Sequence, residues 1–413
     1  MTALPPLRNI TPAHSALRHG GDHTAHAVTV FGGRVVVAEL VHERSSRSDH
    51  RRIAAAPNGG DGWVTLLSDR LDAEYRGPPS PVVKSALRFT LDSTGDPERL
   101  VAQFSSPLGS SVLWGDERGL ESHTEPDPHL EGWLQCAQVV PWGGGFVGLR
   151  EQTAGAGGTL LHSSGPGAPW EPMSGPGDDD PHNQSIGTLV DFNGALYAGT
   201  VNGADGFQLW RCEVDTNNEP RWQRVLSRGA HRFGHNQRVL AAAVLGEALV
   251  LVVGTPPMAR APRAKYDSYG GFELLRVDGN DGWELLAGTP RFTPAGLRVP
   301  LSGLGPAMGQ SRRAEFRGLM VHRGRLMLGT QDTEGFRLWT TVDGETWTGP
   351  PLSEFAGLYQ VDECRGLSLG AHLILALRVT NVDGSRETQL WSTSLGAETD
   401  CDDAVEASAP VET

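Results

Sequence analysis

Ile186–Cys212 reads IGTLVDFNGALYAGTVNGADGFQLWRC, and Arg317–Trp347 reads RGLMVHRGRLMLGTQDTEGFRLWTTVDGETW. In both stretches an apolar segment leads through a Gly-containing turn into a second segment that ends in Gly-Thr. A third segment then ends in Leu-Trp, and a further tryptophan, Trp222 or Trp347, opens a fourth. Four short strands joined by tight turns are typical of one blade of a β-propeller.

Weaker copies of this pattern occur along the whole chain. They repeat at roughly fifty residues, the period of a blade. Counted together, the copies make seven units, whose inner strands begin near residues 26, 86, 136, 186, 239, 317 and 365. We therefore predict an all-β fold, a seven-bladed β-propeller of four-stranded antiparallel blades. The fifth unit is longer than the others because it contains the stretches 256–271 and 288–312.

The two ends of the chain are assigned separately. The last unit stops after its third strand, QLWSTSLG (389–396), and an open blade would leave a strand edge unpaired. Residues 1–12 are therefore predicted to supply the closing strand, with the propeller proper at 13–396. The tail 397–413 has six acidic residues and no lysine or arginine, so we predict that it is disordered and dispensable.

Composition excludes several classes of function. The formal net charge of −14 disfavours binding to a phosphate backbone, so no nucleic-acid partner is expected. The four cysteines show no CxxC spacing, and no P-loop, dinucleotide fingerprint or GxSxG elbow occurs. No segment is apolar enough for a leader or a membrane span. These features predict a cytoplasmic protein with no cofactor and no membrane partner.

One turn and its neighbours resemble a known family. Thr341–Trp347 (TVDGETW) resembles the Asp-box turn of sialidase-like propellers. The units of residues 180–395, with a connector at Arg232–Asn236 (RFGHN), resemble a bacterial family of Asp-box (BNR-type) β-propellers. That family includes the propeller half of the alkylating enzyme that forms aryl–alkyl bonds in cylindrocyclophane biosynthesis. The calcium-binding Gly-Gly-x-Gly-x-Asp repeats of that enzyme do not occur here, and the resemblance assigns no residue roles to this chain.

Candidate site residues lie where the inner strands begin, because these positions share one mouth of a propeller channel. The tripeptide His-Asn-Gln occurs at 182–184 and again at 235–237, while EFRGL and ECRGL begin at Glu315 and Glu363. We expect these side chains to converge beneath the loop 256–271. The catalytic candidates are His182, His235, Glu315, Glu363 and Tyr359. The substrate-binding candidates are Arg238, Arg317, Arg365, Asn183, Asn236, Gln184, Gln237 and His26.

Three chemical interpretations of this set remain open. The arginines could bind a carboxylate or another anion, since guanidinium groups match planar oxyanions. His23, His26, His182 and His235 could bind a metal, although no ligand spacing indicates one. A histidine or glutamate could act as general base, with arginines stabilising the anion and Tyr359 donating a proton. We favour the third.

The same residues also have a structural interpretation. The Glu and Arg pairs could form ion pairs that hold neighbouring blades together, and the His-Asn-Gln tripeptides could cap their loops. The functional hypothesis is an enzyme of specialised metabolism that acts on a small aromatic or anionic substrate. It would catalyse acid/base-assisted bond formation, cyclisation or alkylation without a redox cofactor. The alternatives are a non-catalytic propeller that binds a glycan, peptide or protein, and a sialidase-like glycoside hydrolase.

Overall fold

The structure is a computed structural model of the whole chain, and part of the chain can be described from it. The described residues are 7–12, 24–43, 48–57, 62–71, 86–92, 99–106, 109–116, 119–123, 136–150, 159–165, 168–176, 180–214, 220–255, 271–310, 314–349, 355 and 360–394. Four sequence-based predictions therefore lie outside the described residues: His23, Tyr359, the loop 256–270 and the tail 397–413.

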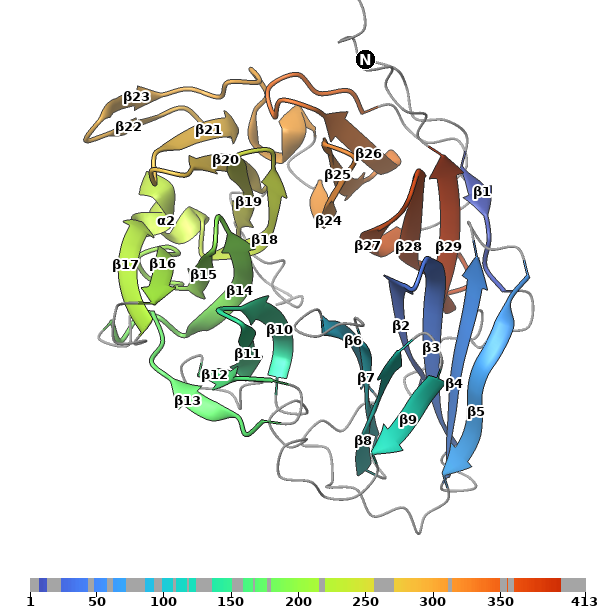
Figure 1. Cartoon of the computed structure of the whole chain (residues 1–413). Coiled ribbons are helices and arrows are strands. Elements are labelled where there is room, and N and C mark those ends of the chain that lie inside the picture. The colour runs from blue at the N-terminus through green and yellow to red at the C-terminus, as the bar shows by residue number, and fades with distance from the viewer. Residues whose placement is uncertain are drawn as a thin grey trace, which may run out of the picture.

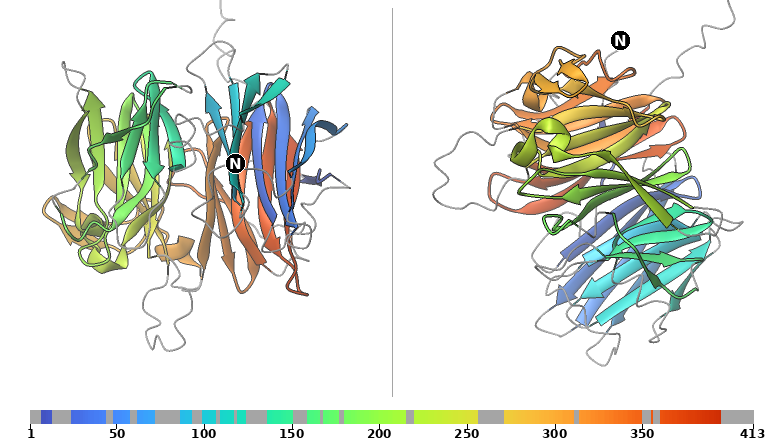
Figure 2. Two further views of the ribbon diagram at one scale, coloured as in Figure 1. Left: turned by 90° about the horizontal axis from the view of Figure 1, so that it is seen from below. Right: turned by 90° about the vertical axis from the view of Figure 1, so that its left-hand side faces the viewer.

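The molecule is built from antiparallel sheets arranged around a common centre (Figure 1). Seen from the side, the strands run from one face of the ring towards the other (Figure 2). The prediction of an all-β, propeller-like fold is confirmed at this level. Helices within the described residues are single turns: α2 (Arg228–His231), η2 (Phe233–His235) and η3 (Pro306–Gly309).

The first half of the chain forms the first three sheets and the start of a larger one. Their strands are β2 (Thr24–Phe31), β3 (Arg34–Glu43), β4 (Ser48–Pro57) and β5 (Val64–Leu71); β6 (Ala86–Asp92), β7 (Arg99–Ser106), β8 (Gly109–Asp116) and β9 (Gly119–His123); β10 (Cys136–Trp142), β11 (Gly145–Arg150), β12 (Leu160–Ser163) and β13 (Glu171–Met173); and β14 (Ser185–Phe192), β15 (Ala195–Val201), β16 (Leu209–Val214) and β17 (Pro220–Leu226).

The second half completes the larger sheet and adds three more. Its strands are β18 (Arg238–Leu245), β19 (Ala248–Gly254), β20 (Glu273–Asp278) and β21 (Trp283–Ala287); the ribbon β22 (Arg291–Thr293) and β23 (Gly296–Arg298); β24 (Glu315–His322), β25 (Arg325–Asp332) and β26 (Gly335–Thr341); and β27 (Gln360–Leu369), β28 (His372–Thr380) and β29 (Arg386–Ser394). The larger sheet has eight strands because one residue pair, Val201↔Arg238, joins β15 to β18.

The short strand β1 (Arg8–Asn9) lies beside β29, at the other end of the chain (Figure 1). Arg8 pairs with Ser392 and Asn9 with Trp391. Beyond the strand, the Ile10 N–H donates to the Leu390 carbonyl over 2.8 Å. The N-terminal segment therefore extends the sheet formed by the C-terminal strands.

The hydrophobic core lies between neighbouring sheets. In β19, Leu249, Leu251 and Val253 pack into one buried cluster with Tyr197 of β15. The alternate residues of the same strand, Val250 and Val252, belong to a second cluster that includes Leu326 and Leu328 of β25. Because side chains alternate across a strand, a strand buried on both faces needs an almost continuous apolar run, and ALVLVVG provides one.

The turn at Thr341–Trp347 is held by its own side chains. The Asp343 carboxylate accepts hydrogen bonds from the N–H groups of Glu345 and Thr346, each at 2.8 Å. The Thr341 hydroxyl donates to the same carboxylate over 2.8 Å, and the Trp347 indole N–H donates to the Gly344 carbonyl over 2.8 Å. Although partial burial opposes ionisation of Asp343, these hydrogen bonds lower its pKa to about 2.

Replacing this aspartate with alanine (Asp343→Ala) should lower the free energy of unfolding by about 1 kcal/mol at neutral pH, as for other side chains that cap backbone N–H groups. The folded-state pKa lies below the ordinary 3.8, so the contribution is present above that value and disappears as the pH falls through about 2. Urea unfolding of the variant and of wild type at several pH values measures the difference. Val342→Ala, at the exposed neighbouring position, is the control. An equal difference at neutral and strongly acidic pH would contradict the assignment.

Candidate functional site

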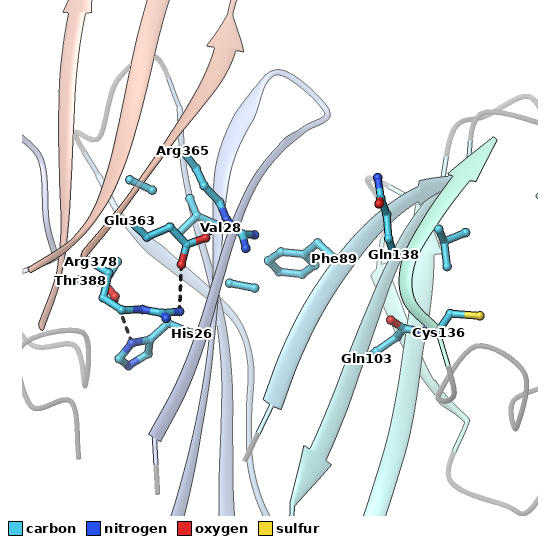
Figure 3. A pocket seen from close by; sticks show the side chains of 13 residues that line it. His26, Val28, Phe89, Gln103, Cys136, Gln138, Glu363, Arg365, Arg378 and Thr388 are labelled. Atoms are coloured by element: carbon cyan, nitrogen blue, oxygen red, sulfur yellow. Dashed lines mark hydrogen bonds and ion pairs between the residues drawn. The ribbon is translucent and has the colours of Figure 1, made fainter. Parts of the chain in front are cut away.

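A cavity of about 450 Å³ lies between strands of the first three sheets and of the last one. One side of it is formed by β2 together with β27, β28 and β29, and the other by β6, β7 and β10. Figure 3 shows the charged side chains on one side, Gln103 and Cys136 on the other, and Phe89 between them. Strands from the beginning, the first third and the end of the chain thus share one cavity.

Strand register assembles the charged side. Glu363 of β27 lies opposite Arg378 of β28, and Arg378 lies opposite Thr388 of β29. Residues directly opposite each other project from the same face of a sheet, so the three side chains form a row. The row ends at β2, where the Thr388 hydroxyl lies 3.3 Å from Nδ1 of His26 (Figure 3).

Glu363 is the centre of an ion cluster with two arginines. Its Oε1 accepts a hydrogen bond from Nε of Arg365 at 2.5 Å, and its Oε2 lies 3.3 Å from Nη2 of Arg378. Burial opposes ionisation of this carboxyl, but the charges of Arg365 and Arg378 outweigh it and lower the pKa of Glu363. The carboxylate is therefore ionised at neutral pH. We call Arg365, Glu363 and Arg378 the arginine–glutamate cluster.

The guanidinium groups of the cluster are accessible. The side chains of Arg365 and Arg378 are 66% and 55% exposed, whereas that of Glu363 is 30% exposed. Each guanidinium has five N–H donors on three nitrogens. The Glu363 carboxylate contacts one nitrogen of each arginine, Nε of Arg365 and Nη2 of Arg378. Donors therefore remain for a bound molecule.

The opposite side of the cavity is less polar. It includes the Phe89 ring, Val139 and the buried thiol of Cys136. Gln138 also lines it, but its amide donates to the Leu189 carbonyl at 2.8 Å and accepts from the Leu189 N–H at 3.2 Å. Gln138 therefore ties β10 to β14, and its amide is engaged with the protein backbone.

The structure brings together three of the predicted site residues: His26, Glu363 and Arg365. The other described candidates do not line this cavity, because it is bounded by the first three sheets and the last one. They belong to the strands and loops between 180 and 317, namely His182, Asn183, Gln184, His235, Asn236, Gln237, Arg238, Glu315 and Arg317.

The two His-Asn-Gln tripeptides make local contacts in their loops. Nδ1 of His182 lies 2.8 Å from Asp205, and the Asn183 amide donates to Gln208 at 3.1 Å. Asn236 is buried and donates to Glu273 at 2.8 Å. The backbone N–H groups of Gln184 and Gln237 donate to carbonyls at the ends of β15 and β19. These contacts fit the loop-capping interpretation of the tripeptides.

Glu315 and Arg317 form a pair like that of Glu363 and Arg365, with 2.5 Å between Glu315 Oε2 and Arg317 Nη2. Both pairs join residues of a single strand, so neither of these two contacts links one blade to the next. The two motifs also sit at different depths. Glu315 is the first residue of β24, with a bulge after Phe316, whereas β27 begins three residues before Glu363 and has its bulge after Val361.

Arg238 opens β18, and its guanidinium is half-buried. Burial lowers its pKa, and no carboxylate of the described residues forms an ion pair with it. Neither Arg238 nor the pair on β24 lines the cavity, so the three arginines of the anion-binding interpretation, Arg238, Arg317 and Arg365, are not all part of its lining.

Sequence reasoning missed Arg378, Thr388, Phe89 and Gln103. A signal for Arg378 exists, because it interrupts the apolar run of HLILALRVT and the hairpin register places it beside Glu363. Thr388 joins the cavity through the register of β28 and β29, whereas Phe89 and Gln103 contribute to it through the packing of sheets.

Two observations bear on metals and membranes. In the part of the chain that the structure describes, no group of three or more His, Cys, Asp or Glu side chains is arranged to hold a metal ion. Among those same residues, none belongs to a helix that is long and apolar enough to cross a membrane.

Comparison with known proteins supports the fold and leaves the function open. No family model and no curated protein matches the chain. Among solved structures, the polysaccharide lyase Uly1 aligns with a TM-score of 0.52 and 9% identity over 94% of this chain and 92% of its own. The β-propeller domain of the Trilobed protease from Pyrococcus furiosus aligns with 0.48 and 10% over 92% and 99%. The NanB sialidase from Streptococcus pneumoniae aligns with 0.41 and 8% over 95% and 71%.

The chain also spans about half (52%) of the length of the acylaminoacyl peptidase from Pyrococcus horikoshii, with a TM-score of 0.49 and 9% identity over 91% of this chain. Identities this low show the fold alone, because one propeller scaffold serves many unrelated functions. The chain is an all-β protein with a propeller-like arrangement of sheets around a polar cavity.

Proposed function

We propose that the cavity binds a small anionic molecule with an aromatic or apolar body. The observation that supports this is the arginine–glutamate cluster, in which one carboxylate orients two accessible guanidinium groups at the cavity wall. Guanidinium groups bind carboxylates and similar oxyanions through paired, charge-assisted hydrogen bonds. A volume of about 450 Å³ suits a small ligand.

The remaining lining residues would contact the aromatic or apolar body of the ligand. Phe89 offers an aromatic surface, and Ala27, Val28 and Val139 add apolar contacts. An aromatic ring stacked on Phe89 would contribute favourable packing in addition to the hydrophobic effect. We therefore assign the ligand to the class of aryl or alkyl carboxylates, sulfonates and related anions.

Catalysis is the second part of the proposal. Glu363 is an anion at neutral pH and so has the form that accepts a proton, but its lowered pKa makes it a weak base; the neighbouring arginines would stabilise an anion formed beside them. This arrangement supports acid/base-assisted bond formation or cyclisation on the bound molecule. The alternatives are a non-catalytic propeller that binds a glycan, peptide or protein, and a sialidase-like glycoside hydrolase. Turnover of an aryl anion would support the enzyme, whereas binding of a glycan without turnover would support the non-catalytic propeller and cleavage of a glycan the hydrolase.

Binding of an aromatic anion tests the proposal directly. Isothermal titration with benzenesulfonate and with benzoate should give saturable binding to the wild-type protein. Filling the cavity with Val139→Trp should abolish it, whereas Val382→Trp, at a position 81% exposed, should not. No saturable binding of either anion, or equal binding by both variants, would contradict the proposal.

We further infer that the sheets form a ring of seven blades closed by β1. The eight-stranded sheet divides into two four-stranded units at the single pair Val201↔Arg238, and β24–β26 make a unit of their own. β1 occupies the outer edge of the sheet that carries Glu363, Arg378 and Thr388, so closure would stabilise one side of the cavity.

Deleting residues 1–12 should therefore lower the melting temperature by about 5 °C or more, because it removes the β1–β29 pairing and exposes a strand edge. Differential scanning calorimetry measures the effect. Deleting the predicted dispensable tail, 397–413, is the matched control and should leave the melting temperature unchanged. Equal melting temperatures for the two truncated proteins would contradict closure of the ring by β1.

A further inference from the structure

We propose that Glu363 makes the cavity selective for the charge of its ligand, so that monoanions bind more tightly than dianions. This inference rests on the proposed anion-binding function and specifies its substrate class. It follows from the balance of charge in the cavity and from the position of Glu363 between the two arginines.

The balance is set by few groups. Among the described residues that line the cavity, the charged side chains are Arg365, Arg378 and Glu363, which sum to one positive charge. His26 is the one other titratable group of that lining besides the Cys136 thiol, and its Nδ1 faces the Thr388 hydroxyl. With His26 neutral and the thiol protonated, a bound monoanion compensates the lining charge.

A dianion would leave one negative charge uncompensated beside Glu363. The carboxylate contacts both guanidinium groups, at 2.5 Å and 3.3 Å, so an anion that binds the same two groups must approach the carboxylate. Like charges at such short range repel strongly in a partly desolvated site. Glu363 therefore does two things: it orients the arginines, and it opposes a second negative charge.

The test uses two ligands that differ in charge while sharing a phenyl ring and a tetrahedral head group. Benzenesulfonate is a monoanion, and phenyl phosphate is essentially a dianion at about pH 8, since the second pKa of such phosphates lies near 6. Titration calorimetry at this pH should show that wild type binds benzenesulfonate about tenfold more tightly than phenyl phosphate. Glu363→Gln should reverse the preference, because the lining then carries two positive charges.

A matched control separates this local effect from overall charge. Glu387 precedes Thr388 on β29 and does not line the cavity. Glu387→Gln removes one negative charge there and should leave the preference for benzenesulfonate over phenyl phosphate unchanged. If Glu363→Gln does not fold, Val139→Lys raises the lining charge independently and should shift the preference in the same direction.

The outcomes are distinguishable. Equal or tighter binding of phenyl phosphate by wild type, or an unchanged preference in a folded Glu363→Gln or Val139→Lys protein, overturns the charge selection and leaves the proposed function standing. Binding of neither ligand to wild type overturns the proposed function, and the selection with it.

Discussion

Replacing Arg378 with methionine (Arg378→Met) is expected to weaken the binding of benzenesulfonate by about tenfold to a hundredfold, the loss typical of one charge-assisted contact. Methionine keeps most of the length of the side chain but removes one of the two guanidinium groups from the arginine–glutamate cluster. The remaining lining would then carry no net charge. Titration calorimetry measures the affinity, and Arg386→Met, at an exposed position on β29, is the control.

The same two variants distinguish a binding role from a structural one. The Arg378 side chain is 55% exposed, and ion pairs at exposed positions contribute little to stability, so we expect the melting temperature to change by a few degrees at most. Weak binding with near-normal stability supports a site. Normal binding with low stability would mean that the cluster holds β27 to β28 and does nothing more.

Replacing Gly318 with alanine (Gly318→Ala) should lower the free energy of unfolding by about 3 kcal/mol or prevent folding, as overpacking of a buried contact does. A Cβ atom on Gly318 would overlap the carbonyl oxygen of Cys364. That oxygen belongs to the backbone of β27, the inner strand of the neighbouring sheet, so a change of rotamer cannot relieve the overlap. Denaturant unfolding measures the loss.

Gly305→Ala is a suitable control for this variant. The nearest atom to a Cβ at Gly305 lies 4.0 Å away, and the backbone there has φ of −72°, which any residue adopts. If Gly318→Ala and Gly305→Ala have the same stability, the close approach of β24 to β27 is not a constraint on this fold.

The sequence by itself determined the class of fold and most of the described strands. The unit at Arg317–Trp347 is an exception: β24, β25 and β26 form a three-stranded sheet, and within the described residues the predicted fourth strand at Trp347 is reduced to one isolated bridge, Thr340↔Thr348. Consecutive antiparallel strands joined by short turns are local structures, so their apolar runs and turn residues can be read directly along the chain. IGTLVDF and ALYAGTV become β14 and β15, and RGLMVH and RLMLGTQD become parts of β24 and the whole of β25. The aspartate of the 341–347 turn likewise makes its hydrogen bonds within four residues of its own position.

Only the tertiary structure decided which polar residues share a cavity. EFRGL and ECRGL are equivalent in sequence, yet the bulge falls after Phe316 in β24 and after Val361 in β27. A bulge adds one residue to a strand and so changes the face and the depth of every side chain near it. Glu363 consequently meets Arg378 across β27 and β28, and Thr388 meets His26, a residue 362 positions away in sequence. The first contact depends on where the bulge falls in a hairpin in which HLILALRVT already marks Arg378. The second depends on how the last sheet packs against β2, which no local pattern of residues encodes.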